Sequence, residues 1–185
     1  MSNIKQSVAA LSEGGVIAYP TEGVFGLGCD PDNQDAIEKL LAIKQRPIEK
    51  GLILIAANYQ QLLSYIDESQ LSVDQLSQIK RSWPGAVTWI MPCQPHLSNH
   101  LTGAFNSLAV RVSDHPIVQE LCLALDKPIT STSANLTGEP SCMTTEEVAE
   151  QLGDKLDAIV MGKTSGRRKP SQIIDAMTGK VLREG

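Results

Sequence analysis

Short apolar runs alternate with amphipathic segments along most of this chain. Residues 3–13 and 33–45 space their apolar side chains three and four positions apart, as one face of an α-helix does. Residues 16–19 and 51–56 are short, nearly continuous apolar runs, which are typical of buried strands. The same criteria predict further helices at residues 58–65, 73–82, 116–125 and 144–152, and further strands at residues 86–91, 107–112, 128–132, 158–161, 172–175 and 180–183.

The order of these elements predicts the fold class. Alternation of buried strands with amphipathic helices is typical of an α/β sheet covered by helices. The predicted strands at 86–91 and 107–112 have no predicted helix between them, and the last two strands have none either. Such connections favour antiparallel pairs. We therefore expect a twisted, open, mixed parallel and antiparallel sheet flanked by helices, with ligands at loops beyond strand ends.

Composition narrows the classes of protein to which the chain can belong. With 185 residues, 42% hydrophobic and 20% charged, it is expected to form a single globular domain over residues 1–185. The longest apolar run, Leu52–Ala57, is far shorter than the ~20 residues of a membrane-spanning helix. A net charge of −5 and an aromatic content of 4% argue against a uniformly basic or base-stacking nucleic-acid surface.

The cysteines and the N-terminal residues indicate the cellular compartment. The four cysteines are widely spaced and form no Cys-x-x-Cys pair, which argues against a disulfide framework or a zinc knuckle. The first twenty residues lack the basic start and apolar block of a secretory signal. We therefore expect a cytoplasmic protein that does not interact with membranes.

Three loops next to predicted strands carry groups suited to ligand binding. Residues 20–28 (PTEGVFGLG) contain three glycines, which permit either a ligand close to the backbone or a tight turn. Lys44 and Arg46 flank the predicted end of a helix, a position that suits both the helix dipole and a bound phosphate. Residues 130–135 (TSTSAN) carry five hydroxyl or amide side chains, more than a simple turn needs.

Two further features are basic. Arg111 lies inside the predicted strand 107–112, where a buried arginine needs either an acidic partner in the protein or a substrate carboxylate. Residues 163–169 contain Lys163, Arg167, Arg168 and Lys169. From sequence alone this cluster is either a solvated loop or a flexible segment over phosphates.

Six stretches, in this order, resemble the YrdC family in its short bacterial form. They are residues 19–30 (YPTEGVFGLGCD), 44–47 (KQRP), 83–85 (WPG), 108–112 (LAVRV), 131–135 (STSAN, followed by Gly138) and 170–171 (PS). Each stretch alone is a weak signal, whereas six in sequence are very specific. The resemblance implies one YrdC-like domain with a concave basic cavity.

The resemblance also implies an activity. Such family members join L-threonine, bicarbonate and ATP, as nucleotidyltransferases that release threonylcarbamoyl-adenylate and pyrophosphate. A threonylcarbamoyl-transferase complex then uses this product to modify adenosine 37 of tRNAs that read ANN codons. Mg²⁺ is expected on the ATP phosphates, largely through water, so no protein ligand set for a metal is predicted.

The resemblance assigns roles to individual positions. Two cations would be catalytic and would also contact ATP: Lys44 and Arg46. Hydroxyl, amide and guanidinium groups would complete the ATP site: Ser131, Ser133, Asn135 and Arg183. The threonine site would consist of Thr21, Arg111 and Ser171.

The implied chemistry suits these residue types. The N-carboxylate of threonine and the α-phosphate of ATP are both anionic, so the protein must hold them together and neutralise charge. We expect Lys44 and Arg46 to contact phosphate and carbamate oxygens directly. Arg111 would bind the threonine carboxylate with two parallel hydrogen bonds, and Ser133 and Asn135 would bind phosphate or ribose.

Two other functions stay open at this point. The chain could be a module that binds double-stranded RNA or tRNA through the basic residues 163–169. It could also be a hydrolase in which Lys44 activates the hydroxyl of Ser131 or Ser133.

Overall fold

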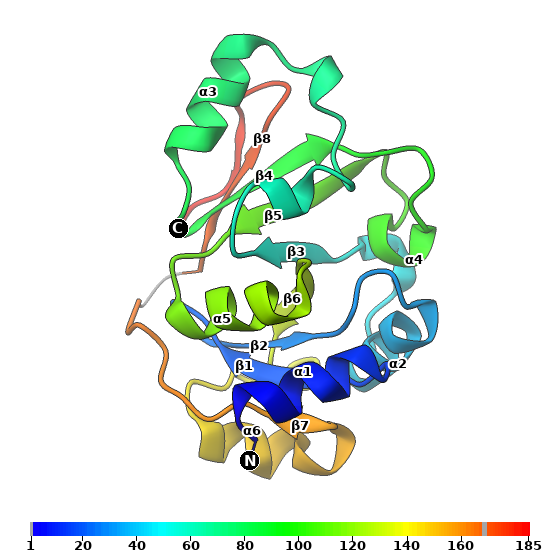
Figure 1. The fold of residues 1–185 in the computed structure, drawn as a ribbon, viewed down its shortest axis with the longest axis vertical. Helices are drawn as coiled ribbons and strands as arrows, with labels where there is room; N and C mark the ends of the chain where they lie inside the picture. The colour runs from blue at the N-terminus through cyan, green and yellow to red at the C-terminus, as the bar shows by residue number, and fades with distance from the viewer. Residues whose placement is uncertain (1, 168–169) are drawn as a thin grey trace.

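A computed structural model describes residues 2–167 and 170–185, which form one twisted sheet with helices on both faces (Figure 1). The strands lie side by side in the order β7 (Ala158–Ile159), β1 (Ile17–Pro20), β2 (Phe25–Gly28), β6 (Ile129–Ser133), β3 (Ile53–Ala56), β5 (Ser107–Val112), β4 (Val87–Pro92), β8 (Gln172–Asp175) and β9 (Val181–Arg183). Strand β3 runs parallel to β5, whereas β4 and β5 pair antiparallel, as do β8 and β9. The prediction of a mixed α/β sheet is confirmed.

Six α-helices surround this sheet in the described residues. They are α1 (Ile4–Ser12), α2 (Gln34–Lys44), α3 (Val73–Arg81), α4 (Asn99–Thr102), α5 (Pro116–Leu125) and α6 (Thr145–Leu152). The side chains of Asn3, Ser72 and Thr144 each accept a backbone N–H of the first helical turn, which fixes where α1, α3 and α6 begin. No helix in the described part of the chain is long and apolar enough to cross a bilayer.

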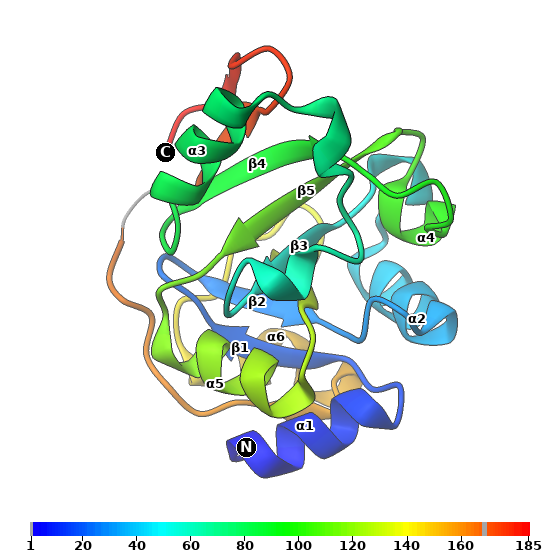
Figure 2. The ribbon, with the colours of Figure 1, turned by 45° about the horizontal axis from the view of Figure 1, so that its top comes forward.

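The hydrophobic core divides into two clusters, one on each face of the sheet. Helices α1 and α5 lie side by side over one face (Figures 1 and 2), where Leu11 and Leu121 pack on Ile55 and Ile129. A larger cluster fills the opposite face, beneath α2, α3 and α6. Because α1 and α5 cover only part of their face, the remainder of that face is available to polar groups.

Three predicted elements differ from the structure. Residues 58–65 form a single 3-10 turn at Gln60–Leu62 rather than a helix. The side chains of Asn58 and Gln61 accept nearby backbone N–H groups, and such local bonds compete with helix formation. The short helix α4 lies between β4 and β5, which sequence analysis left directly connected.

The third difference is that the predicted glycine loop contains a strand, β2. Gly26 and Gly28 lie against the aromatic ring of Tyr19, which is completely buried and donates a hydrogen bond from its hydroxyl to the Thr130 carbonyl at 3.0 Å. These two glycines therefore provide space for a tyrosine ring, a role that neither of the two sequence interpretations included. Their lack of side chains hid the alternating pattern by which a strand is recognised.

We predict that Gly28→Ala destabilises the protein by about 1–3 kcal/mol, the usual cost of overpacking a core. A methyl group there would lie 2.4 Å from the Thr130 carbonyl oxygen and 2.9 Å from the Tyr19 ring. Gly153→Ala is the matched control, because Gly153 has helical backbone angles and its added methyl would meet nothing closer than 3.9 Å. Urea unfolding measures both variants, and equal stabilities would contradict the role given to Gly28.

Candidate functional site

One strip of the sheet remains uncovered on the side that carries α1 and α5. Ser131 of β6 pairs with Ile53 of β3, which also pairs with Ala109 of β5. Ala109 in turn pairs with Ile90 of β4. Directly paired residues point to the same face, and each of these four is half-buried, whereas most of their neighbours along the strands are buried. We call this row of four residues the open strip.

The first polar cluster lies at the end of the open strip where β6 finishes. Ser133 lies two residues beyond Ser131 and therefore points to the same face. The Lys44 ammonium, brought there by the end of α2, donates to the Ser133 carbonyl (2.8 Å), the Asn135 carbonyl (2.7 Å) and Asn135 Oδ1 (2.8 Å). We define Lys44, Arg46, Ser133 and Asn135 as the lysine cluster.

Hydrogen bonds inside the lysine cluster use most of its donors. An ammonium group has three N–H bonds, and Lys44 gives one to each of three protein oxygens. Ser133 donates its hydroxyl to Asn135 Oδ1 at 2.7 Å, and Asn135 donates its amide to the carbonyls of Leu136 and Glu139. In this structure the N–H groups of Lys44 and Asn135 are therefore already bonded to protein oxygens and do not point to a phosphate site.

The same bonds bear on the hydrolase alternative. Lys44 donates to the carbonyl oxygen of Ser133 and not to its hydroxyl, whose proton goes to Asn135. A serine activated by a lysine needs the amine within hydrogen-bond reach of the hydroxyl. The geometry therefore does not support a Ser/Lys nucleophile at this position.

Arg46 is held differently. Its Nε and one terminal nitrogen donate to the Gly51 carbonyl at 3.1 and 2.9 Å, and a longer contact of 3.5 Å reaches the Lys50 carbonyl. Its Nη1 has no hydrogen bond within the described residues. Arg46 therefore retains the donors that Lys44 lacks, next to the same cluster.

The second polar cluster lies at the opposite end of the open strip, where β5 finishes. Arg111 follows Ala109 by two residues and is paired with Glu22, with 3.1 Å between Arg111 Nη1 and Glu22 Oε2. The turn between β1 and β2 brings Glu22 there, and Ser113 donates its hydroxyl to Glu22 Oε1 at 2.7 Å. Of the two partners considered for a buried Arg111, the acidic side chain is present in this structure.

Ser171 and Arg183 join Arg111 from the C-terminal hairpin. Arg183 donates to the Ser171 carbonyl at 2.8 and 3.1 Å and to its hydroxyl at 3.1 Å. The Ser171 hydroxyl also lies 2.9 Å from that of Thr88 on β4, and the next residue of β4, Trp89, pairs with Val110, the neighbour of Arg111 on β5. Burial and the charge of Arg111 lower the pKa of Arg183. We define Glu22, Arg111, Ser113, Ser171 and Arg183 as the arginine cluster.

Two predicted residues lie between or beside the clusters. Ser131 belongs to the open strip itself. Thr21 is buried and donates its hydroxyl to the Val24 carbonyl at 2.7 Å, so this hydroxyl stabilises the turn that carries Glu22. Ser131 therefore lies where a ligand on the strip would be, whereas the contact of Thr21 with threonine stays a prediction.

The basic segment 163–169 is described only in part. Ser165 and Arg167 donate backbone N–H groups to the carbonyls of Thr21 and Glu22, so the chain before residue 168 follows the β1–β2 turn. Arg168 and Lys169 lie outside the described residues. The structure thus places the start of this segment beside the arginine cluster and does not decide between its two interpretations.

The spacing of the clusters sets what they can bind. Ser133 of β6 and Arg111 of β5 have β3 between them and lie in rows four residues apart, an offset of roughly 13 Å along the strands at the usual strand rise. One end of the strip carries Lys44 and Arg46, and the other carries Arg111 and Arg183. A surface with cations at both ends suits two anionic molecules that must meet between them.

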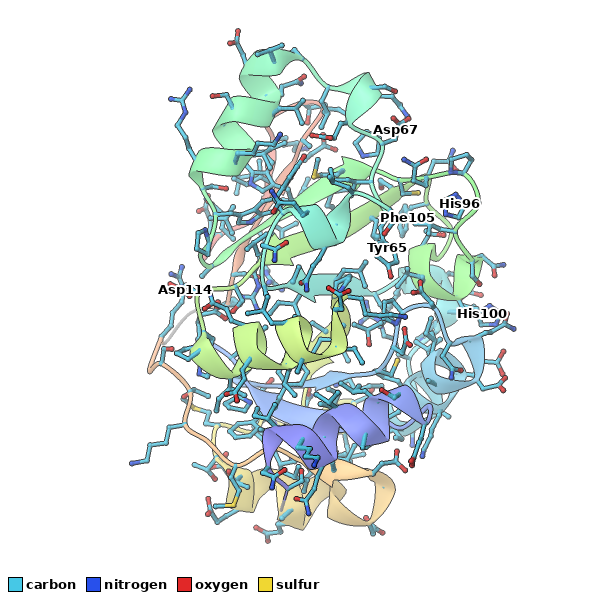
Figure 3. The ribbon with its side chains drawn as sticks, viewed as in Figure 1. Tyr65, Asp67, His96, His100, Phe105 and Asp114 are labelled. Atoms are coloured by element: carbon cyan, nitrogen blue, oxygen red, sulfur yellow. The ribbon has the colours of Figure 1, made fainter. Side chains whose placement is uncertain are left out.

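Three cavities lie outside the open strip, and the first of them reaches Arg46 of the lysine cluster. The first, about 460 Å³, is lined in part by Arg46 and His100, and the second, about 300 Å³, by Tyr65 and His96. Figure 3 shows Tyr65, His96 and His100 near α4, on the opposite side of the view from Asp114. The third cavity, about 220 Å³, lies under the turn at Met177. None of the three contains Lys44 or Arg111, so the concave basic cavity stays a prediction.

Metal-binding side chains do not gather within residues 2–167 and 170–185. No three histidine, cysteine, aspartate or glutamate residues among them lie close enough to form a metal site.

We predict that activity depends on the protonation of Lys44. Burial, with a smaller contribution from the charge of Arg46, lowers the pKa of Lys44 to about 8. Above that pH the amine loses its charge, so transition-state stabilisation should decline as pH rises past 8. The pH profile of kcat/KM for ATP, the nucleotide that the family resemblance implies, measures this decline. A kcat/KM that still rises at pH 9.5 would contradict the prediction.

Sequence analysis missed two members of the arginine cluster, Glu22 and Ser113. Glu22 lies inside a stretch that was singled out for its glycines, and its charge beside the β1 strand end was the available signal. Ser113 follows β5 by one residue and gives no signal in sequence, because its role depends on a partner 91 residues away.

Comparison with known proteins agrees with this architecture. The family model Sua5_yciO_yrdC, described as "Telomere recombination", matches residues 9–185. A Vibrio campbellii protein named threonylcarbamoyl-AMP synthase is 65% identical over 185 residues, which is all of both chains.

Solved structures give the same result. E. coli YciO superposes with a TM-score of 0.86 at 30% identity, over 98% of this chain and 88% of that one. P. abyssi Sua5 complexed with L-threonine gives a TM-score of 0.86 at 31% identity over 93% of this chain. This chain spans about half the length of that Sua5 protein (50%). The chain therefore belongs to the Sua5/YciO/YrdC family.

Proposed function

We propose that this protein catalyses the synthesis of threonylcarbamoyl-AMP from L-threonine, bicarbonate and ATP. The observation that carries the proposal is the pair of cationic clusters at the two ends of the open strip. Full-length relatives that are 55–65% identical and named threonylcarbamoyl-AMP synthase support it. The P. abyssi Sua5 complex supports an amino-acid site in this fold.

In this proposal the arginine cluster binds threonine and the lysine cluster binds ATP. Arg111 has donors besides Nη1 with no hydrogen bond in the described residues, and these suit a carboxylate. The carbamate oxygen formed on the threonine nitrogen attacks the α-phosphorus, and the bond from that phosphorus to pyrophosphate breaks. Ser131 lies between the clusters, where the two substrates meet, and Ser171 and Arg183 complete the surroundings of Arg111.

Lys44 and Arg46 have different roles at the phosphates. Arg46 donates through its remaining N–H groups to the phosphates. Lys44 contributes positive charge at short range and holds Ser133 and Asn135 in place, since its own donors are occupied. Charge fixed before the reaction needs no rearrangement as pyrophosphate leaves, which is the most effective form of electrostatic catalysis.

Mg²⁺ enters this site with ATP. It neutralises part of the phosphate charge, and its coordination is completed by phosphate oxygens and water. The product is an activated carbamoyl group, which a threonylcarbamoyl-transferase complex moves to adenosine 37 of tRNAs that read ANN codons. We place this reaction in the cytoplasm, where ATP and tRNA are found.

The direct test is to incubate the purified protein with ATP, Mg²⁺, L-threonine and bicarbonate. Mass spectrometry should detect threonylcarbamoyl-adenylate, together with one pyrophosphate per product molecule. Omission of bicarbonate, with CO₂ removed from the buffer, is the control and should abolish both products. Pyrophosphate release that is independent of threonine would overturn the proposal.

A further inference from the structure

Glu22 is a buried carboxylate to which the proposed reaction assigns no role. Its side chain is 6% exposed, and the residue lies on the turn between β1 and β2. Burial raises the pKa of Glu22, but the charge of Arg111 and the hydrogen bond from Ser113 outweigh that effect and hold the pKa below its usual value. Glu22 is therefore an anion placed against the guanidinium that receives the substrate carboxylate.

Both oxygens of Glu22 lie against protein groups. Oε1 accepts the Ser113 hydroxyl at 2.7 Å, and Oε2, which is buried and has no hydrogen-bond partner among the described residues, lies 3.1 Å from Arg111 Nη1. A carboxylate oxygen without exposed surface cannot contact a substrate in this conformation. Any influence of Glu22 on the amino acid must therefore pass through Arg111.

Arg111 needs such a partner because its own strand does not fix it. A guanidinium has five N–H donors, and the contact that holds this one among the described residues is the ion pair with Glu22, in which charge attraction acts over 3.1 Å without a well-aligned hydrogen bond. Ser113, the first residue after β5, is itself buried and donates its hydroxyl to Glu22, so the group that fixes Glu22 comes from the same end of β5 as Arg111. The two neighbours leave the other nitrogens of Arg111 free of hydrogen bonds within the described residues.

We propose that Glu22 and Ser113 are positioning residues that fix the guanidinium of Arg111 in the orientation that receives the carboxylate of the amino-acid substrate. The inference rests on the proposed function and adds two residues that act on the substrate through Arg111, without contacting it themselves. Asp114, in the turn between β5 and α5 (Figure 3), is the other acidic group facing Glu22. Burial, then the hydrogen bond and charge of Glu22, raise the pKa of Asp114.

The test is binding of L-threonine by calorimetry, without ATP, to the full-length protein and to Glu22→Gln. We expect the dissociation constant for threonine to rise roughly tenfold or more, because a charge-assisted contact loses its orientation. KM for ATP, measured at saturating threonine, should change less than about twofold. Glu120→Gln removes an exposed carboxylate from α5 and should leave both constants unchanged.

Each result decides for or against the proposal. Unchanged threonine affinity in a folded Glu22→Gln protein would overturn it. Tighter threonine binding would overturn it too, since Glu22 would then be a competitor for Arg111. An equal loss for ATP and threonine would indicate a merely structural role and would also count against it.

Ser113→Ala and Glu22→Asp keep the test usable if Glu22→Gln fails to fold. Ser113→Ala removes one hydrogen bond to Glu22 and should weaken threonine binding in the same direction but by less. Glu22→Asp retains the charge and should recover part of the affinity lost in Glu22→Gln. Wild-type synthesis of threonylcarbamoyl-adenylate is measured separately, so failure of the proposed function is distinguished from failure of this inference.

Discussion

Lys44→Ala should reduce the rate of threonine-dependent pyrophosphate release roughly 100- to 1000-fold, the usual cost of losing a preorganised charge in the transition state. It should also lower the stability by about 2–4 kcal/mol, because three protein oxygens lose their donor. That loss is smaller than the stability of a typical domain, so the variant should remain folded. Steady-state kinetics and urea unfolding measure the two effects.

Lys39→Ala is the control on the same helix. Lys39 forms an exposed ion pair with Asp157 at 2.7 Å, and such pairs contribute at most about 1 kcal/mol. Its activity should be normal. Near-normal turnover in Lys44→Ala would show that the lysine cluster does not stabilise charge in the reaction. A loss of stability without a loss of turnover would restrict Lys44 to a structural role.

Arg111→Lys should weaken threonine binding by roughly two orders of magnitude while leaving the affinity for ATP nearly unchanged. Lysine keeps the positive charge and can still pair with Glu22, but it cannot present two parallel N–H groups to a carboxylate. The substitution therefore separates the geometry of the guanidinium from its charge. Calorimetric titration with L-threonine measures the effect directly.

Arg81→Lys provides the matched control for Arg111→Lys. Arg81 is exposed at the end of α3 and bonds only the Ser77 hydroxyl among the contacts described here. Both affinities should be unchanged in that variant. Threonine binding by Arg111→Lys within threefold of wild type would remove Arg111 from the threonine site.

Elements with a strong local pattern could be predicted from the sequence. Helix α5 was expected at residues 116–125 and has those bounds, and α3 and α6 each match the predicted ranges 73–82 and 144–152 to within one residue. In each case the signal lies within one turn of chain. Strand β2 was missed because its glycines serve the ring of Tyr19, a partner on another strand.

The candidate site was predictable in its members but not in their contacts. The polar residues at 131–135 and the cations at 44 and 46 stand out in sequence, and in the structure Lys44 meets Ser133 and Asn135 at the end of β6. Lys44 donates its three N–H groups to protein oxygens. These bonds could not be predicted from the sequence, because the acceptors lie about 90 residues away along the chain. The partner of Arg111 was left open for the same reason.

The long sequence separation within the site has a kinetic consequence. Lys44 meets Asn135 across 91 residues, Glu22 meets Ser113 across 91, and Thr88 meets Ser171 across 83. Chains dominated by such distant contacts fold slowly. The entropy cost of closing a long loop must be met before the contact that it allows can stabilise the chain. During refolding, catalytic competence should therefore return only with the slowest global phase, after helix formation is complete.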